Sequence, residues 1–264
     1  NVTMDPKDTD IPTLEKKVVE DRKYQQDGGY GATFNDVADY DIGDRVQFKL
    51  ISSIPDMTAY DTYTYVFHDT LPKGLTLDPD SFDVYVAYNK NDNPALEGWT
   101  ELGAEYYTIE PTDTENGGGS FTVTFNDLKT VPNTTDGDHK YIYVSYYTTL
   151  NTNAEIGLDG NVNSAYLEFS NDPNDETSTG ETAEDTVIVF TYGLDGTKVD
   201  GEDGTTRLEG AQFVLLSSGK TQAAAVVNGK VTKWVQVRTE GANPDALQMP
   251  ETYEEWVERY GEQN

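Results

Sequence analysis

Most of the chain shows apolar and polar residues alternating with a period of two. Short runs of this kind predict β-strands that bury one face. Segments rich in glycine, proline, asparagine and aspartate separate the runs and predict turns. The alternating runs lie at residues 14–18, 46–50, 63–69, 84–86, 121–125, 140–149 and 165–171. Because no strong helical period interrupts them, we predict an all-β fold of immunoglobulin-like antiparallel β-sandwich domains in tandem.

Changes in composition predict the domain organisation. Residues 1–10 are polar and are expected to form a flexible tail, and residues 11–175 a first sandwich. Residues 176–186 are acidic, lack large apolar side chains and are expected to form a linker. Residues 187–264 read as part of a second, smaller sandwich, with strands near 187, 211–216 and 223–227. A short helix is expected near 250–260, where Tyr253, Trp256, Val257 and Tyr260 have helical spacing.

Charge and residue usage exclude several classes of function. The 264 residues include 18 basic and 48 acidic side chains, giving a net charge of −30. Such a chain is a poor partner for nucleic acid or an anionic membrane, and no apolar run is long enough for membrane insertion. Cysteine is absent, so disulfides, thiolate nucleophiles and cysteine-bound zinc are excluded. With two histidines and no nucleotide-binding or hydrolase motif, the profile suits a secreted or surface β-protein.

Three polar residues fall in step with the apolar positions of their strands: Lys16, Asp69 and Asn171. Burial lowers the pKa of a lysine and raises that of an aspartate, so a buried pair is driven toward a neutral amine and a protonated acid. A neutral amine can attack a carboxamide carbon while the acid polarises the carbonyl oxygen. The product would be a Lys–Asn isopeptide bond that the protein makes on itself.

Other interpretations of these residues stay open. Lys16 could extend its charged end to water, or Lys17 could be the buried lysine if the register slips by one residue. Asp69 and Asn171 are both followed by turn-forming residues and could simply stabilise turns.

Residues 11–175 resemble the isopeptide-forming domain of sortase-assembled pilin subunits and related surface adhesins of Gram-positive bacteria. The resemblance rests on five motifs in the same order, at residues 12–18, 40–48, 67–75, 160–163 and 167–173. It implies that Lys16 is the reacting lysine, Asp69 the catalytic acid and Asn171 the asparagine. Asn163 is a second, less favoured acceptor.

Residues 187–264 resemble the start of a collagen-adhesin B-type domain, through the segments 194–200 and 208–215. Lys198 stands where that domain type has its own cross-linking lysine. The catalytic glutamate and the closing asparagine of the domain type are missing from this sequence, so a second cross-link is not expected. The sequence also has no L-P-x-T-G sorting signal and no Y-P-K-N pilin motif.

The resemblance implies an extracellular structural subunit of a Gram-positive pilus or cell-wall adhesin. Its expected partners are other pilin or adhesin subunits and sortase, with a host protein or glycan as a further partner. We expect no cofactor, no metal and no enzyme activity beyond a single self-reaction. One alternative is a host-ligand binding module in which the bond only stiffens the scaffold. A less favoured alternative is a polysaccharide-processing enzyme.

Overall fold

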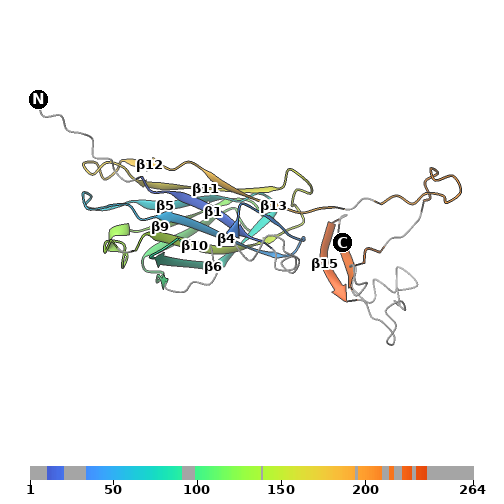
Figure 1. Ribbon diagram of the computed structural model, residues 1–264, viewed down its shortest axis with the longest axis horizontal. Helices are drawn as coiled ribbons and strands as arrows, with labels where there is room; N and C mark the ends of the chain where they lie inside the picture. Colours follow the sequence, from blue (N-terminus) through green and yellow to red (C-terminus); the bar gives the residue numbers. More distant parts are fainter. Residues whose placement is uncertain are drawn as a thin grey trace, which may run out of the picture.

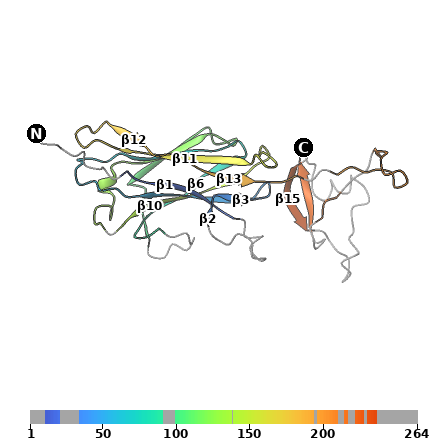
Figure 2. The same ribbon diagram turned by 45° about the horizontal axis from the view of Figure 1, so that its top comes forward.

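The computed structural model of this chain is built almost entirely of β-strands. It describes residues 11–20, 34–90, 99–137, 139–193, 196–209, 214–216, 222–227 and 230–236. Two large sheets lie face to face and form an elongated sandwich (Figures 1 and 2). This confirms the predicted all-β, immunoglobulin-like fold class. The chain enters the sandwich at Ile11 and leaves after Phe190 at the opposite end of its long axis (Figure 1).

The first layer, sheet A, contains the strand that carries Lys16. Its strand order is β2-β1-β4-β10-β6-β7, and every pair is antiparallel. The strands are β2 (Phe34–Asn35), β1 (Leu14–Val19), β4 (Arg45–Ser53), β10 (Tyr141–Leu150), β6 (Leu75–Ala87) and β7 (Thr100–Glu101). In the described part of the chain, strand β1 therefore lies near one edge of the sheet, next to the two-residue strand β2.

The second layer, sheet B, contains the strands that carry Asp69 and Asn163. Its order is β3-β13-β11-β5-β9-β8, with β12 also paired to β11. The strands are β3 (Val37–Asp39), β13 (Asp185–Phe190), β11 (Asn161–Ser170), β5 (Tyr65–Thr70), β9 (Ser120–Phe125), β8 (Tyr107–Thr112) and β12 (Thr179–Glu181). Among the described strands of this sheet, only β13 and β3 pair in parallel. Residues 34–39 pass from the edge of sheet A to the edge of sheet B.

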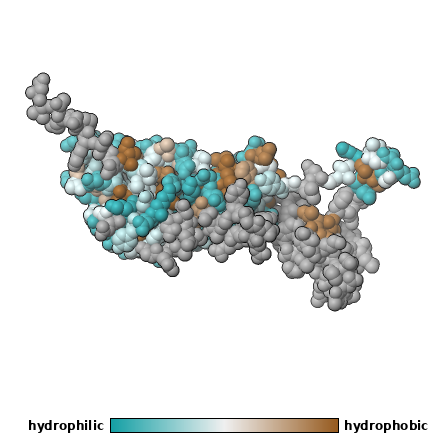
Figure 3. Space-filling model, viewed as in Figure 1, coloured by the Kyte–Doolittle hydropathy of each residue, from teal (hydrophilic) through white to brown (hydrophobic). Residues whose placement is uncertain are grey.

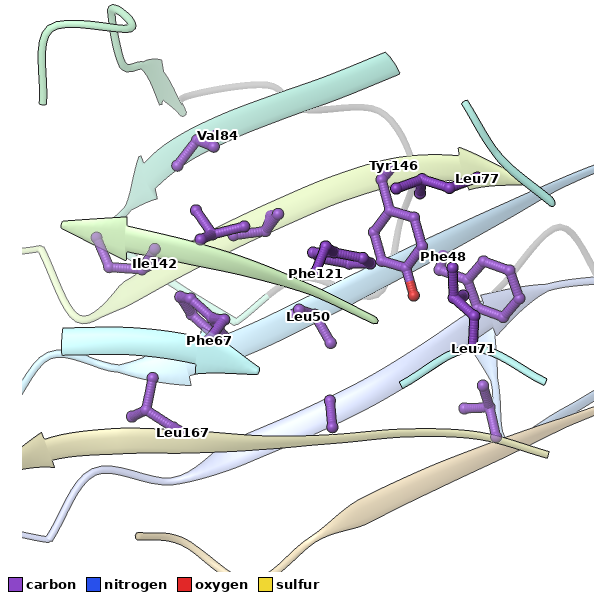
Figure 4. Packing of buried hydrophobic residues seen from close by; sticks show 14 of the residues in the cluster. Phe48, Leu50, Phe67, Leu71, Leu77, Val84, Phe121, Ile142, Tyr146 and Leu167 are labelled. Carbon is purple, nitrogen blue, oxygen red and sulfur yellow. The ribbon is translucent and has the colours of Figure 1, made fainter. Parts of the chain in front are cut away.

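A single apolar core fills the space between the two sheets. Figure 4 shows side chains from both layers meeting there, among them Phe48 and Leu50 of sheet A and Phe67 and Leu167 of sheet B. All four are fully buried. A 3₁₀ turn, η2 (Leu128–Thr130), closes one end of the core through Leu128. The surface drawn in Figure 3 is mostly hydrophilic, as the acidic composition requires.

The seven alternating runs all fall on observed strands or enter them, and their apolar positions face the core. The prediction missed the short strands β2, β3, β7 and β12, and also β8, where most side chains are exposed. Two-residue and three-residue strands are too short for a period of two to be recognised. Exposed edge strands carry no apolar face to recognise.

The predicted boundary after residue 175 is wrong in the structure. Strands β12 and β13 fall within or just after the expected linker, 176–186, yet both pair with β11. Val187 and Val189 of β13 are fully buried in the core. The first sandwich thus extends to Phe190. The linker was predicted from acidic, polar residues, and these form the solvent-facing β12 and the entry into β13.

Beyond the sandwich, β14 (Gln222–Val227) and β15 (Lys230–Gln236) form an antiparallel pair. The strand expected at 223–227 corresponds to β14, and that at 211–216 is described only in part. The helix expected near 250–260 lies outside the described residues. Within the described part of the chain, no helix is long and apolar enough to cross a membrane.

One prediction tests the sandwich core on a single strand. Leu167 and Val162 both lie on β11, but Leu167 is fully buried whereas Val162 is 46% exposed. We expect Leu167→Ala to lower the free energy of unfolding by about 2–5 kcal/mol, because it leaves a cavity between the sheets. Val162→Ala is the matched control and should cost less than about 1 kcal/mol. Urea unfolding of both variants measures the difference, and equal losses would contradict the assigned faces of β11.

Candidate functional site

The lysine predicted to react lies in the core. Lys16 is in the middle of β1, opposite Leu50 of β4, and its side chain is fully buried. Its backbone N–H donates a hydrogen bond to Oδ2 of Asp185 at 2.7 Å. This bond joins β1 of sheet A to β13 of sheet B, so β1 is held against both layers. The in-phase position of Lys16 with Val18 predicted this burial correctly.

The acid reaches the same place from the opposite sheet. Asp69 lies on β5, between Phe121 of β9 and Ala165 of β11, and is 1% exposed. The Nζ atom of Lys16 donates a short hydrogen bond to Oδ2 of Asp69, and the two groups form a fully buried pair. Lysine and acid therefore connect the two sheets through the core.

The structure does not bring Asn171 to this pair. Asn171 follows the end of β11, is exposed, and accepts a hydrogen bond from the hydroxyl of Ser178 at 2.7 Å. Ala165 is the β11 residue opposite Asp69. At about 3.3 Å per residue, Asn171 lies roughly 20 Å farther along the chain. The assignment of Asn171 as the acceptor therefore does not agree with the geometry.

Asn163 occupies the position expected of the acceptor. It lies on β11 just before Ala165, shares its inward face and is fully buried. Its Nδ2 atom donates a hydrogen bond at 2.9 Å to the hydroxyl of Tyr146. The same hydroxyl accepts a hydrogen bond at 2.9 Å from Nζ of Lys16. The less favoured acceptor in the sequence is thus the asparagine beside the lysine and the acid.

Tyr146 was not recognised from the sequence. It lies on β10, where the pairing with β6 is irregular between Ser145 and Tyr147. Its hydroxyl donates a hydrogen bond to Oδ2 of Asp69 at 2.8 Å, in addition to the two that it accepts. In the sequence it is an aromatic residue at one of the positions of β10 expected to be buried. Nothing in the pattern distinguishes it from a residue that only packs in the core.

Aromatic rings enclose the polar group. The ring of Tyr146 stacks on Phe48 at 5.3 Å and on Phe82 at 5.5 Å, and Phe121 meets it edge-on at 4.8 Å. The Nζ atom of Lys16 lies 5.6 Å from the centre of the Phe48 ring. Figure 4 shows the Tyr146 side chain within the core beside Phe48 and Phe121. Rings on several sides keep water away and lower the local dielectric.

This environment determines where the protons lie. Burial lowers the pKa of Lys16, although Asp69 opposes the shift. Burial raises the pKa of Asp69, although Lys16 and Tyr146 oppose the shift. Desolvation is the largest effect in both cases, because each charged form loses its hydration. The pair is driven toward an uncharged amine and a protonated carboxyl group.

Two buried oxygens of the group have no hydrogen-bond partner among the residues that the structure describes: Oδ1 of Asp69 and Oδ1 of Asn163. A protonated carboxyl group has one O–H donor, and a carboxamide oxygen is an acceptor. A proton on Oδ1 of Asp69 would leave its Oδ2 free to accept from Lys16 and Tyr146, as observed. The same proton would provide a donor for a carboxamide oxygen. The arrangement can therefore support acid-assisted attack of the amine on the Asn163 carboxamide.

The second predicted lysine is in a different environment. Lys198 is exposed, and its carbonyl group accepts a hydrogen bond from the Leu208 N–H. It is not part of the buried group of Lys16, Asp69 and Asn163.

Comparison with known proteins gives similarity at the level of fold. No family model and no curated protein sequence matches the chain. Its structure is similar to that of BcpA, the major pilin subunit of Bacillus cereus, with a TM-score of 0.52. The two are 22% identical over 87% of this chain and 53% of that one. A backbone pilin of Streptococcus pyogenes with three modular domains gives a TM-score of 0.55. The identity is 21%, over 86% of this chain and 46% of that one.

The chain therefore spans about half the length of each of these pilins. At such low identities the likeness shows the sandwich fold that they share with this chain.

The raised pKa of Asp69 predicts a pH-dependent stability once the lysine is removed. In Lys16→Met, the folded carboxyl group should hold its proton well above its ordinary pKa of 3.8. The stability gained from that proton is fully present below the pKa that Asp69 has in the unfolded chain. It is lost as the pH rises to the higher pKa that Asp69 has in the folded chain. Unfolding free energy should fall by about 1.4 kcal/mol per pH unit within this window.

The control is Lys16→Met combined with Asp69→Asn, which has the same shape and no titrating group at position 69. Urea unfolding between the two pKa values should show the decline only in the single variant. Parallel pH profiles for the two variants would contradict a raised pKa at Asp69. Repulsion among the many surface acids affects both variants equally and cancels in the comparison.

Proposed function

We propose that this chain is a structural subunit of a Gram-positive pilus or surface adhesin, and that an isopeptide bond made by the protein itself fastens its sandwich. The bond joins Nζ of Lys16 to Cγ of Asn163, with Asp69 as the acid. The observation that carries the proposal is the fully buried group of these residues between the two sheets.

The chemistry follows from the state of each group. The uncharged amine of Lys16 is a nucleophile, and Cγ of Asn163 is the electrophile. Asp69 polarises the carboxamide oxygen and takes part in the proton transfers. Fixed positions in the core replace the encounter of separate molecules, which provides effective molarities of about 10⁵–10⁸ M for well-aligned groups. Ammonia is released, so the reaction is irreversible once it has left the core.

A role in carrying tension fits the place of the bond in the fold. The chain enters and leaves at opposite ends of the long axis, so tension on the chain would act along the strands (Figure 1). Lys16 lies near the start of the sandwich and Asn163 on one of its last strands. The bond would carry tension past the intervening residues. The similarity to two pilins, which also contain sandwiches of this kind, supports an extracellular role in a fibre or on a cell surface.

The high negative charge agrees with such a location. At −30, neighbouring copies repel one another at low salt, which favours solubility and limits lateral association. The absence of cysteine means that a cross-link would have to be made by other chemistry, and a Lys–Asn amide is not sensitive to reduction.

Intact mass tests the bond directly. The wild-type protein should be lighter than its sequence mass by one ammonia. Asn163→Ala and Asp69→Asn should restore the full mass, since one lacks the electrophile and the other lacks the acid. Asn171→Ala is the matched control and should keep the loss of ammonia. A wild-type protein at full sequence mass would refute the proposed bond, and loss of the bond only in Asn171→Ala would reassign the acceptor.

Single-molecule pulling tests the mechanical role. With Lys16 bonded to Asn163, residues 17–162 lie inside a covalent loop and should not lengthen when the ends of the sandwich are pulled. Residues 164–190 lie outside the loop and should still extend. In Asn163→Ala the full length of the sandwich should unfold, whereas Asn171→Ala should behave as wild type. Release of residues 17–162 in the wild-type trace would contradict the proposed role of the bond in carrying tension.

A further inference from the structure

The hydroxyl group of Tyr146 contacts every polar member of the buried group. It accepts hydrogen bonds from Nζ of Lys16 and Nδ2 of Asn163, both at 2.9 Å. It donates one to Oδ2 of Asp69 at 2.8 Å. A phenol has one donor and two acceptor positions, and all three are used here. The hydroxyl therefore stands between the nitrogen that would attack and the nitrogen that would leave.

We propose that Tyr146 is a catalytic residue of the self-reaction, in which its hydroxyl passes a proton to the departing nitrogen of Asn163. This inference rests on the proposed cross-link and adds to it a role for a residue that binds all three reacting partners. It differs from a purely packing role, which the ring alone would fulfil.

The steps balance without any further reagent. The Nζ lone pair of Lys16 forms a bond to Cγ of Asn163, while the carboxamide oxygen gains negative charge and accepts the proton of Asp69. Nζ then returns one proton to the carboxylate of Asp69. In the tetrahedral intermediate Nδ2 has a lone pair, so the two hydrogen bonds of Tyr146 reverse. The hydroxyl gives its proton to Nδ2 and takes one from the carboxyl group of Asp69. The Cγ–Nδ2 bond breaks as the carbonyl re-forms and its proton returns to the carboxyl group.

The sum of these steps is an amine plus a primary amide giving a secondary amide plus ammonia. The uncharged amine of Lys16 loses one proton and keeps the other on the new amide, and the leaving nitrogen departs with three. Two of the three were already on Nδ2, and the third comes from Lys16 by way of Asp69 and Tyr146. The proton lent to the carboxamide oxygen returns to Asp69 when the carbonyl re-forms. Asp69 and Tyr146 end as they began.

The contacts explain why the acid alone is not enough. Asp69 Oδ2 is bonded to Lys16 and to Tyr146. In the described residues, the hydrogen bond given by Nδ2 of Asn163 goes to Tyr146. The leaving nitrogen thus reaches the carboxyl group through the phenol. Since an amide nitrogen leaves poorly unless it is protonated, the relay addresses the difficult step of the reaction.

The surroundings keep the phenol in place and protonated. Its ring lies between Phe48 and Phe82, with interplanar angles of 16° and 21°, and Phe121 packs against its edge. Burial, together with the nearby carboxyl group of Asp69, raises the pKa of Tyr146 well above its usual value. The hydroxyl therefore keeps its proton at neutral pH and can donate it when the leaving nitrogen becomes basic.

The test is the rate of cross-linking in Tyr146→Phe, which keeps the ring and removes the hydroxyl. Unfolded chains are purified in denaturant before any bond has formed, and are then refolded by dilution. Intact mass follows the loss of ammonia, and tryptophan fluorescence follows folding. We expect Tyr146→Phe to fold and to lose ammonia on the order of 10²-fold more slowly than wild type, the usual size of a general acid's contribution.

Tyr143→Phe is the matched control. Tyr143 is also a buried tyrosine of β10, but its hydroxyl bonds to the carbonyl of Asn89, away from the reacting group. It should cross-link at the wild-type rate. A folded Tyr146→Phe that cross-links as fast as Tyr143→Phe would overturn the proposed relay and leave the bond itself intact. A wild-type chain that folds without losing ammonia would instead refute the proposed function.

A second measurement applies if Tyr146→Phe does not fold. The wild-type rate is measured in mixtures of water and deuterium oxide. If the relay moves more than one proton in the slow step, a plot of the rate against the deuterium fraction is curved. A linear dependence or no dependence would overturn the relay.

Discussion

The burial of Lys16 against Asp69 is the interaction on which this sandwich depends. Two ionisable side chains, one from each sheet, meet where no water can hydrate them. As a charged pair they would have to recover a large desolvation cost, and loss of either partner would leave the other buried alone. The cost is smaller when the pair is uncharged, with a neutral amine on Lys16 and a protonated carboxyl group on Asp69. Converting the amine to an amide would remove it, because an amide carries no charge at any ordinary pH.

The period-of-two pattern was enough to find the main strands and the two ionisable residues of the site. Lys16 and Asp69 are in step with core positions such as Val18 and Phe67, and the structure buries both. Phase was not enough to choose the asparagine, because Asn163 in β11 and Asn171 just after its end have the same phase. The choice depends on which β11 residue lies opposite Asp69, and that register is set by the pairing of β11 with β5.

Two other features could not be read from the sequence for different reasons. The hydroxyl of Tyr146 matters only because three side chains distant in sequence converge on it, and the 18 tyrosines of the chain look alike in a one-dimensional pattern. Strand β13 follows an acidic segment typical of a linker, and its membership in the sandwich comes from pairing with β11 and β3. Local composition reports exposure, whereas sheet membership is decided by long-range pairing.

The order of the site residues along the chain has a consequence for the timing of biosynthesis. The lysine is made first, Tyr146 follows 130 residues later, and Asn163 comes 17 residues after that. A nascent chain that has exposed only its first strands has the proposed nucleophile but not yet Asn163, so the proposed bond could not form prematurely. The strand that carries the asparagine is made after every other core strand of the sandwich except β13. The proposed bond would thus form late in the synthesis of the sandwich, and a chain truncated before β11 would lack the acceptor Asn163 and could not form it.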